Sequence, residues 1–293
     1  MTHHHHLTVG SFLISATLFL IGLVYLRQWM RVAWLVPDDV KSWRVGSFLV
    51  GLLLVWVGLC SPLSFLDHDL LTVHMVQHLL LMTLAPPLIL LGAPWKLLPQ
   101  RREQRPVEPI ARRHGGPIGQ EGRMLLHPVV GWIGATATLV VWHIPGAFML
   151  GLRSEMWHEI EQASFLVTGL LFWWPVVEPS RDTLKWPESS ILLYLFLATL
   201  PCDILSGFLV FCDRVVYPFY LSSSQRFGLT ALEDQQCAGA LMWTCVTIVY
   251  LIAGAVFAAR LLSPRWSPDY LILQSESQAI AVAHQEEQRM EVV

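Results

Sequence analysis

The chain has 293 residues, of which 54% are hydrophobic and only 14% are charged, and its formal net charge is −3. Soluble domains carry about a quarter charged residues, so this composition excludes an ordinary soluble domain and indicates a protein that crosses a membrane several times. The small net charge gives no support for nucleic-acid binding.

Seven apolar segments are long enough to cross a bilayer, which takes roughly 20 helical residues. They are 8–26, 46–66, 70–93, 128–150, 160–178, 189–211 and 238–261. The sequence therefore predicts an all-α fold: a polytopic membrane helical bundle of seven transmembrane helices over residues 1–263, followed by a C-terminal tail over 264–293. Basic residues follow the first segment and none precedes it, which is the reverse of a cleavable signal peptide. We expect that segment to be retained.

Lys and Arg are distributed unevenly over the predicted connections. Of the 19 such residues, only Arg153, Arg214 and Arg226 fall on one side of a seven-helix arrangement, and the other sixteen fall on the opposite side. Cytoplasmic loops carry the excess of positive charge. This split predicts an N-terminus outside and a cytoplasmic C-terminus, with 94–127 as a basic cytoplasmic loop.

The five cysteines form no CxxC pair, and the absence of CxxCH excludes covalently attached haem. Cys212 and Cys237 flank the predicted outer connection, where oxidising conditions permit a disulfide. The sequence does not fix their separation, so a disulfide and two free thiols both remain open. No phosphate-binding loop and no GxSxG motif occurs, and we therefore expect no enzymatic activity.

His74 and His78 begin the third predicted helix in the stretch HMVQH. Residues four apart lie on one helix face, so both imidazoles can reach one object. Imidazole is a ligand of copper, zinc and haem iron, and thioether suits reduced copper. Met75 is turned by roughly 100° from the His74–His78 face, so Met82 is the better same-side candidate.

Other polar residues gather at the same predicted outer ends of helices, in the stretches WHIPG, MWHEIEQ and LEDQQ. Ionisable groups within a membrane are costly and mark functional sites by default. The complete set of candidate metal ligands is His74, His78, His143, His158, Glu161, Asp234, Met82 and Met242.

Each of these residues also has a structural interpretation. A membrane histidine can simply hydrogen-bond to a neighbouring helix, and Asp234 can cap the start of its own helix. The alternatives to metal delivery are haem held between His78 and His143, a copper transporter, and a scaffold that binds no metal. The transporter is the least favoured, because the inner halves of the helices carry few ionisable groups.

Four stretches together resemble the polytopic CtaG-type cytochrome c oxidase assembly factors of bacteria: HMVQHLLLMTLAPPLILLGAP, WHIPG, GLLFWWPV and LEDQQCAGALMW. The resemblance implies a multi-pass protein of the bacterial inner membrane that acts in the maturation of haem-copper oxidase, with copper as the metal. It also implies oxidase subunits, and other copper chaperones, as partners. In one place the sequence departs from the family pattern His-x-x-Glu-His, because Gln162 stands where the last histidine is expected. An amide is a poor ligand for a transition metal.

Overall fold

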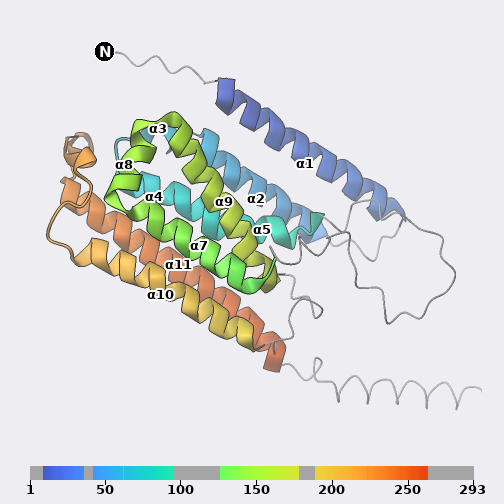
Figure 1. Ribbon diagram of the computed structural model, residues 1–293. Helices are drawn as coiled ribbons and strands as arrows, with labels where there is room; N and C mark the ends of the chain where they lie inside the picture. Colours follow the sequence, from blue (N-terminus) through green and yellow to red (C-terminus); the bar gives the residue numbers. More distant parts are fainter. Residues whose placement is uncertain are drawn as a thin grey trace, which may run out of the picture.

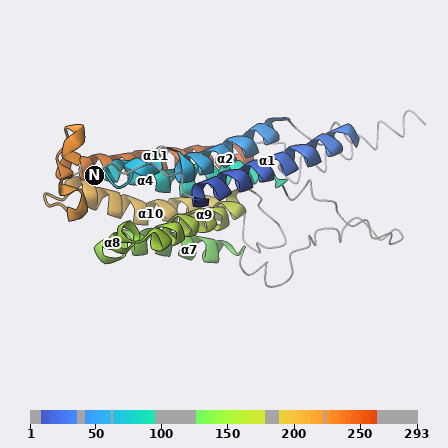
Figure 2. The same ribbon diagram turned by 90° about the horizontal axis from the view of Figure 1, so that it is seen from above.

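The computed structural model describes residues 9–35, 42–61, 63–94, 126–177, 189–222 and 224–262, and every regular element among them is a helix. The all-α prediction is confirmed. The basic loop and the C-terminal tail that we predicted fall almost wholly outside these residues, so the boundary near residue 263 stays a prediction. The helices form an elongated bundle in which the long elements run side by side (Figures 1 and 2).

The longer helices follow the predicted apolar segments, and short helices connect them at one end of the bundle. In chain order the elements are α1 (Val9–Leu35), α2 (Ser42–Cys60), α3 (Leu63–Leu66), α4 (Leu71–Leu79), the π-helical η1 (Leu80–Leu84), α5 (Ala85–Leu91), α7 (Pro128–His143), α8 (Pro145–Arg153), α9 (Glu155–Val177), α10 (Ser190–Phe211), the 3-10 turns η4 (Pro218–Leu221) and η5 (Ser224–Phe227), and α11 (Ala231–Leu262).

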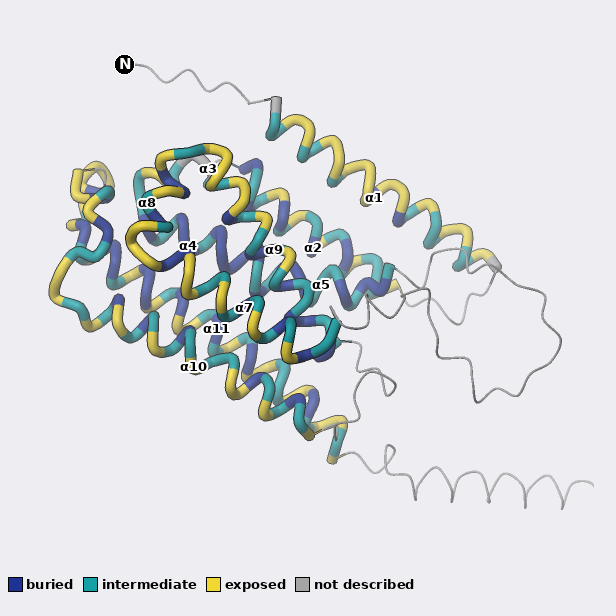
Figure 3. Tube along the Cα trace, viewed as in Figure 1, coloured by how far each residue is buried: buried dark blue, intermediate teal, exposed yellow. Residues whose placement is uncertain are grey.

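Six of these helices are long and apolar enough to cross a membrane, and there are seven spans if the bent pair α7–α8 counts as one. Large apolar side chains remain exposed on the outer faces of the bundle, for example Phe19 and Phe196, which suits contact with lipid tails. The burial pattern shows α1 as the most exposed of the long helices (Figure 3). The chain therefore has the architecture of a multi-pass membrane protein.

The predicted helix 128–150 is not continuous, which corrects the expectation from the sequence. It breaks at Ile144, and α7 and α8 meet at an angle of 78°. The cause is Pro145, since the residue before a proline is disfavoured in the helical region, and Ile144 is extended with ψ 126°. The His143 carbonyl at the break accepts a hydrogen bond from the Tyr217 hydroxyl at 2.8 Å.

The third span is continuous from Leu71 to Leu91 but contains the wide turn η1. Pro86 and Pro87 have no N–H group to donate to the Met82 carbonyl. That carbonyl instead accepts a hydrogen bond from the Trp173 indole at 3.2 Å. Gly169 allows α9 to lie against this turn, because an added Cβ would come within 2.8 Å of the same carbonyl oxygen. The wide turn thus holds α9 beside the third span.

The last span begins at Ala231, seven residues before the predicted start at 238. Thr230 and Glu233 form a reciprocal capping box: the Glu233 carboxylate accepts from the Thr230 amide at 2.8 Å, and the Thr230 hydroxyl accepts from the Glu233 amide at 3.2 Å. The polar residues LEDQ are therefore part of the helix. All five cysteines are free, so no disulfide joins Cys212 to Cys237 in this structure.

Candidate metal centre

His74, His78 and Glu161 form a buried cluster near the end of the bundle that carries α3 and α8. The His74 and His78 Nε2 atoms lie 2.8 Å apart, and the Glu161 Oε1 atom lies 3.6 Å from the first and 3.3 Å from the second. The three side chains are at most 7% exposed. His74 and His78, the predicted pair on α4, thus face the Glu161 carboxylate on α9.

The three ligand atoms are spaced as a metal ion would require. Ligands about 2.0–2.1 Å from a tetrahedral ion lie about 3.4 Å from one another, and the observed separations of 2.8, 3.3 and 3.6 Å bracket this value. Aromatic rings fix the imidazoles, since Phe165 stacks on His78 and Phe148 packs edge-on against His74. The 2.8 Å contact is a hydrogen bond between the two imidazoles, so an ion would replace the proton between them and would need only small side-chain movements.

The Glu161 carboxylate is buried against two imidazoles, which compensate its charge only when they are protonated. Neither oxygen makes a hydrogen bond of normal geometry within the described part of the chain, although the residue is only 1% exposed. Burying a carboxylate without compensation is strongly unfavourable. Gly151 of α8 lies directly over it, and a Cβ there would come within 2.6 Å of Oε2. This packing encloses the carboxylate against the two imidazoles.

His143 and Met75 lie next to this cluster and form a soft pair of donor atoms. The His143 Nδ1 atom is 2.7 Å from the Leu139 carbonyl. Because a carbonyl only accepts hydrogen bonds, Nδ1 carries the proton and Nε2 keeps a lone pair. That Nε2 faces the Met75 sulfur at 3.4 Å. Met75 was not among the predicted ligands, but its sulfur lies against His143 in the structure.

The preferred methionines, Met82 and Met242, lie further along the bundle. Both line a cavity of about 40 Å³ whose wall also includes Met75, His78 and His143. A space of this size holds one or two water-sized groups. The structure therefore brings Met82 and Met242 to the same cavity as His78, His143 and Met75.

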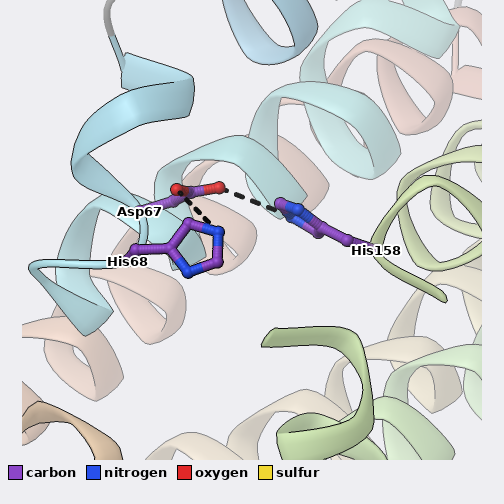
Figure 4. A group of neighbouring side chains, drawn as sticks. All are labelled: Asp67, His68 and His158. Atoms are coloured by element: carbon purple, nitrogen blue, oxygen red, sulfur yellow. Dashed lines mark ion pairs between the residues drawn. The ribbon is translucent and has the colours of Figure 1, made fainter. Parts of the chain in front are cut away.

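His158 belongs to a second group, with Asp67 and His68 (Figure 4). Its Nε2 atom lies 3.4 Å from Asp67 Oδ2, and its ring stacks on that of His74 with centroids 5.8 Å apart. Burial raises the pKa of Asp67 above its ordinary value, an effect that His68 and His74 partly offset. The sequence reasoning missed Asp67 and His68, although the run DHD at an outer helix end was a visible signal.

Asp234 lies apart from both groups, and its side chain caps α4. Its carboxylate accepts hydrogen bonds from the amides of Leu71 at 2.7 Å and Thr72 at 3.1 Å, and from the Thr72 hydroxyl at 2.7 Å. Thr230 and not Asp234 caps the start of α11, so the alternative interpretation of Asp234 as the cap of its own helix is wrong. Asp234 therefore fixes the start of the helix that carries His74 and His78.

The neighbouring Gln235 fixes the outer connection in a similar way. Its side-chain oxygen accepts from the Val216 amide at 2.7 Å, and its nitrogen donates to the carbonyls of Leu209 and Arg214 at 3.3 and 3.1 Å. This connection carries Tyr217, which supports the break after His143. The LEDQ stretch thus supports the cluster from outside it.

These features define a class: a multi-pass helical membrane protein with histidine and carboxylate groups buried at one end of its bundle. The chain belongs to the family described as cytochrome c oxidase caa3 assembly factor (Caa3_CtaG), whose model matches residues 23–263. The resemblance that the sequence motifs indicated is thereby confirmed.

Curated relatives include uncharacterized proteins of Mycobacterium bovis and Mycobacterium tuberculosis. Each is 26% identical over 219 residues, covering 69% of this chain and 32% of the relative. An uncharacterized protein of Mycobacterium leprae is 23% identical over 265 residues, covering 85% of this chain and 38% of the relative. The chain thus spans about a third of the length of these relatives. No solved structure matches it.

Proposed function

We propose that this protein assists the placement of copper into a haem-copper oxidase, with His74, His78 and Glu161 binding the ion transiently. Copper is the cargo in this proposal, and the protein performs no chemical conversion. The observation that carries the proposal is the buried Glu161 carboxylate, which faces two imidazoles and has no hydrogen bond of normal geometry among the described residues. A bound cation would compensate that charge.

The neighbouring donor atoms favour reduced copper. Thioether sulfur is a soft ligand that suits Cu(I), and the Met75 sulfur lies beside His143 at the edge of the cluster. Met82 and Met242 line the adjoining cavity and extend the soft surface along the bundle. Copper held by three firm ligands, with further sulfur donors nearby, can be exchanged more readily than copper in a closed shell of four.

The proposed cellular setting follows the family and the distribution of charge. We place the protein in the bacterial inner membrane with its N-terminus outside and its C-terminus in the cytoplasm, as the excess of Lys and Arg in the predicted cytoplasmic connections favours. The partners would be haem-copper oxidase subunits and other copper chaperones. With this orientation the buried cluster lies toward the outer face of the membrane.

The alternative of haem between His78 and His143 is less well supported. Their ring centroids are 6.3 Å apart. The adjoining cavity of about 40 Å³ suits one or two small groups rather than a macrocycle. A scaffold that binds no metal remains the alternative that the following experiment separates from copper delivery.

The test measures copper bound by the purified full chain lacking His3–His6, loaded with Cu(I) under anaerobic conditions. We compare Glu161→Gln with Glu159→Gln, which changes an exposed carboxylate on the same helix. The proposal predicts about one copper per chain in the control and at least a tenfold weaker affinity in Glu161→Gln. It also predicts loss of binding in the double variant His74→Ala/His78→Ala. Equal, negligible copper in all proteins would favour the metal-free scaffold.

A further inference from the structure

We propose that Asp67, His68 and His158 form a second metal site, which takes a divalent cation of the copper or zinc class. This site goes beyond the proposed function, because its three ligands are all different from the three that would hold Cu(I). It lies where the turn after α3 meets the first turn of α9 (Figure 4).

The first observation is a buried carboxylate with unsatisfied oxygens. Asp67 is fully buried, and neither side-chain oxygen makes a hydrogen bond of normal geometry within the described ranges, although the His68 backbone and the Gln77 side chain interact with the carboxylate. Its two oxygens instead face imidazole nitrogens: Oδ1 lies 3.9 Å from His68 Nε2, and Oδ2 lies 3.4 Å from His158 Nε2. A buried carboxylate left in this state is costly unless a cation joins it.

The second observation is the spacing of the ligand atoms. One donor atom from each of the three residues lies within 4.8 Å of the other two, and around a tetrahedral ion the spacing is about 3.4 Å. The contact between Asp67 and His158 already has this length. The His68 side chain is 46% exposed, so it can swing inward by about 1 Å without disturbing the core.

The backbone holds the carboxylate in place. The Tyr220 hydroxyl donates to the Asp67 carbonyl at 2.8 Å, and Tyr220 itself is buried. A ligand fixed by such a contact loses little conformational freedom when an ion binds. His68 has to become ordered, and His158 Nε2 has to leave its hydrogen bond with the Gln162 side chain, which is 3.1 Å long.

The donor set is of the same kind as in the buried cluster, two imidazoles and one carboxylate, and the two sites differ in what lies beside them. Two imidazoles and one carboxylate are the ligands of three-coordinate protein sites that leave one position open for water or exchange. Neither methionine nor cysteine belongs to this group of three. It therefore suits Cu(II) or Zn(II), with Cu(II) the tighter of the two by the usual order of affinities, whereas the buried cluster lies beside a thioether.

The site also lies between solvent and the buried cluster. Side-chain exposure falls from 46% for His68 to 15% for His158 and 0% for Asp67. The His158 ring then stacks on His74, the first imidazole of the buried cluster. A cation arriving from solvent at this end would meet the Asp67 site first.

The experiment titrates Cu(II) into the full chain lacking His3–His6, and reads the binding by electron paramagnetic resonance. The proposal predicts a bound Cu(II) signal with hyperfine coupling to two imidazole nitrogens. It also predicts that His68→Ala and Asp67→Asn each weaken the affinity by at least tenfold. Asp69→Asn is the matched control, because Asp69 lies two residues away and pairs with Arg226 instead. His68 is half exposed, so His68→Ala should keep the fold, which circular dichroism checks.

Three outcomes overturn the second site, and a fourth supports it. If no Cu(II) binds, or if His68→Ala and Asp67→Asn bind like Asp69→Asn, the three residues form no metal site. If binding is lost in His78→Ala but kept in His68→Ala, the ion occupies the buried cluster, which would support the proposed function and refute this inference. Loss of Cu(I) binding in Glu161→Gln with unchanged Cu(II) binding would show that the two sites act separately.

Discussion

Substituting Gly151 by alanine is a direct test of the buried cluster. A Cβ at this position would lie 2.6 Å from the Glu161 Oε2 atom. Ordinary contacts between carbon and oxygen are about 3.3–3.6 Å long, so the carboxylate must retreat by about 0.8 Å. The atom that clashes is the far end of a side chain, and the backbone can stay where it is. The expected result is a folded protein with a displaced ligand.

The displacement is large compared with what a binding site tolerates. The Glu161 Oε1 atom lies 3.3 Å from His78 Nε2, and a shift of the carboxylate by this amount would change that separation by up to about 0.8 Å. Functional groups have to be held to within about 0.5 Å of the productive geometry. We therefore expect the Cu(I) affinity of Gly151→Ala to fall by about tenfold to a hundredfold.

The matched control is Gly146→Ala in the same helix, where an added Cβ meets nothing within 4 Å. Both substitutions gain helix propensity of up to about 1 kcal/mol, so a difference between them reports the contact with Glu161. The assay is competition for Cu(I) with a chromophoric chelator, using detergent-purified chain lacking His3–His6. Equal affinities for the two variants would refute the role of Glu161 as a ligand.

Three further substitutions test the surroundings of the two sites. Asp234→Ala removes three hydrogen bonds to the start of α4. It should lower the free energy of unfolding by about 2 kcal/mol or more in thermal denaturation, relative to the exposed Asp213→Ala. Unchanged stability would show that these hydrogen bonds do not support the start of α4. In Gln162→His, an imidazole replaces the amide whose nitrogen lies 3.1 Å from His158 Nε2. This change should raise the affinity of the Asp67 site for Cu(II) by about tenfold or more in the Cu(II) titration. No change would mean that the new side chain does not reach that site. Tyr217→Phe removes the hydrogen bond to the His143 carbonyl and should lower the free energy of unfolding by about 1 kcal/mol, which is measured as a lower melting temperature. An unchanged melting temperature would show that this hydrogen bond does not support the break between α7 and α8.

The spans could be predicted because membrane helices are long apolar runs, and hydropathy alone identifies them. Their ends could not, because the residues that start or stop a helix act through local geometry. The start of α11 depends on the Thr230–Glu233 capping box, inside a stretch that reads as a polar loop. The break at Ile144 depends on Pro145, and the apolar run over 128–150 favoured one continuous helix although this proline lies within it.

The His74–His78 pair could be predicted because spacing within one helix fixes a shared face. Contacts between helices could not be predicted in this way. Met75 is on a different face of α4 from that pair, yet α7 brings His143 to its sulfur. Asp234 caps a helix more than 160 residues earlier in the chain. Asp67 gains its importance only because the start of α9 packs against it.

The wide turn at Leu80–Leu84 has a consequence for the orientation of the whole cluster. A π-turn acts as one extra residue in a helix, and each residue of an α-helix turns the chain by about 100°. The half that carries His74 and His78 is therefore rotated about the helix axis relative to α5, while the Trp173 contact keeps the turn beside α9. Deleting a single residue in this turn would swing both imidazoles away from Glu161 without changing any ligand. The direction in which the histidines point is thus encoded several residues beyond them.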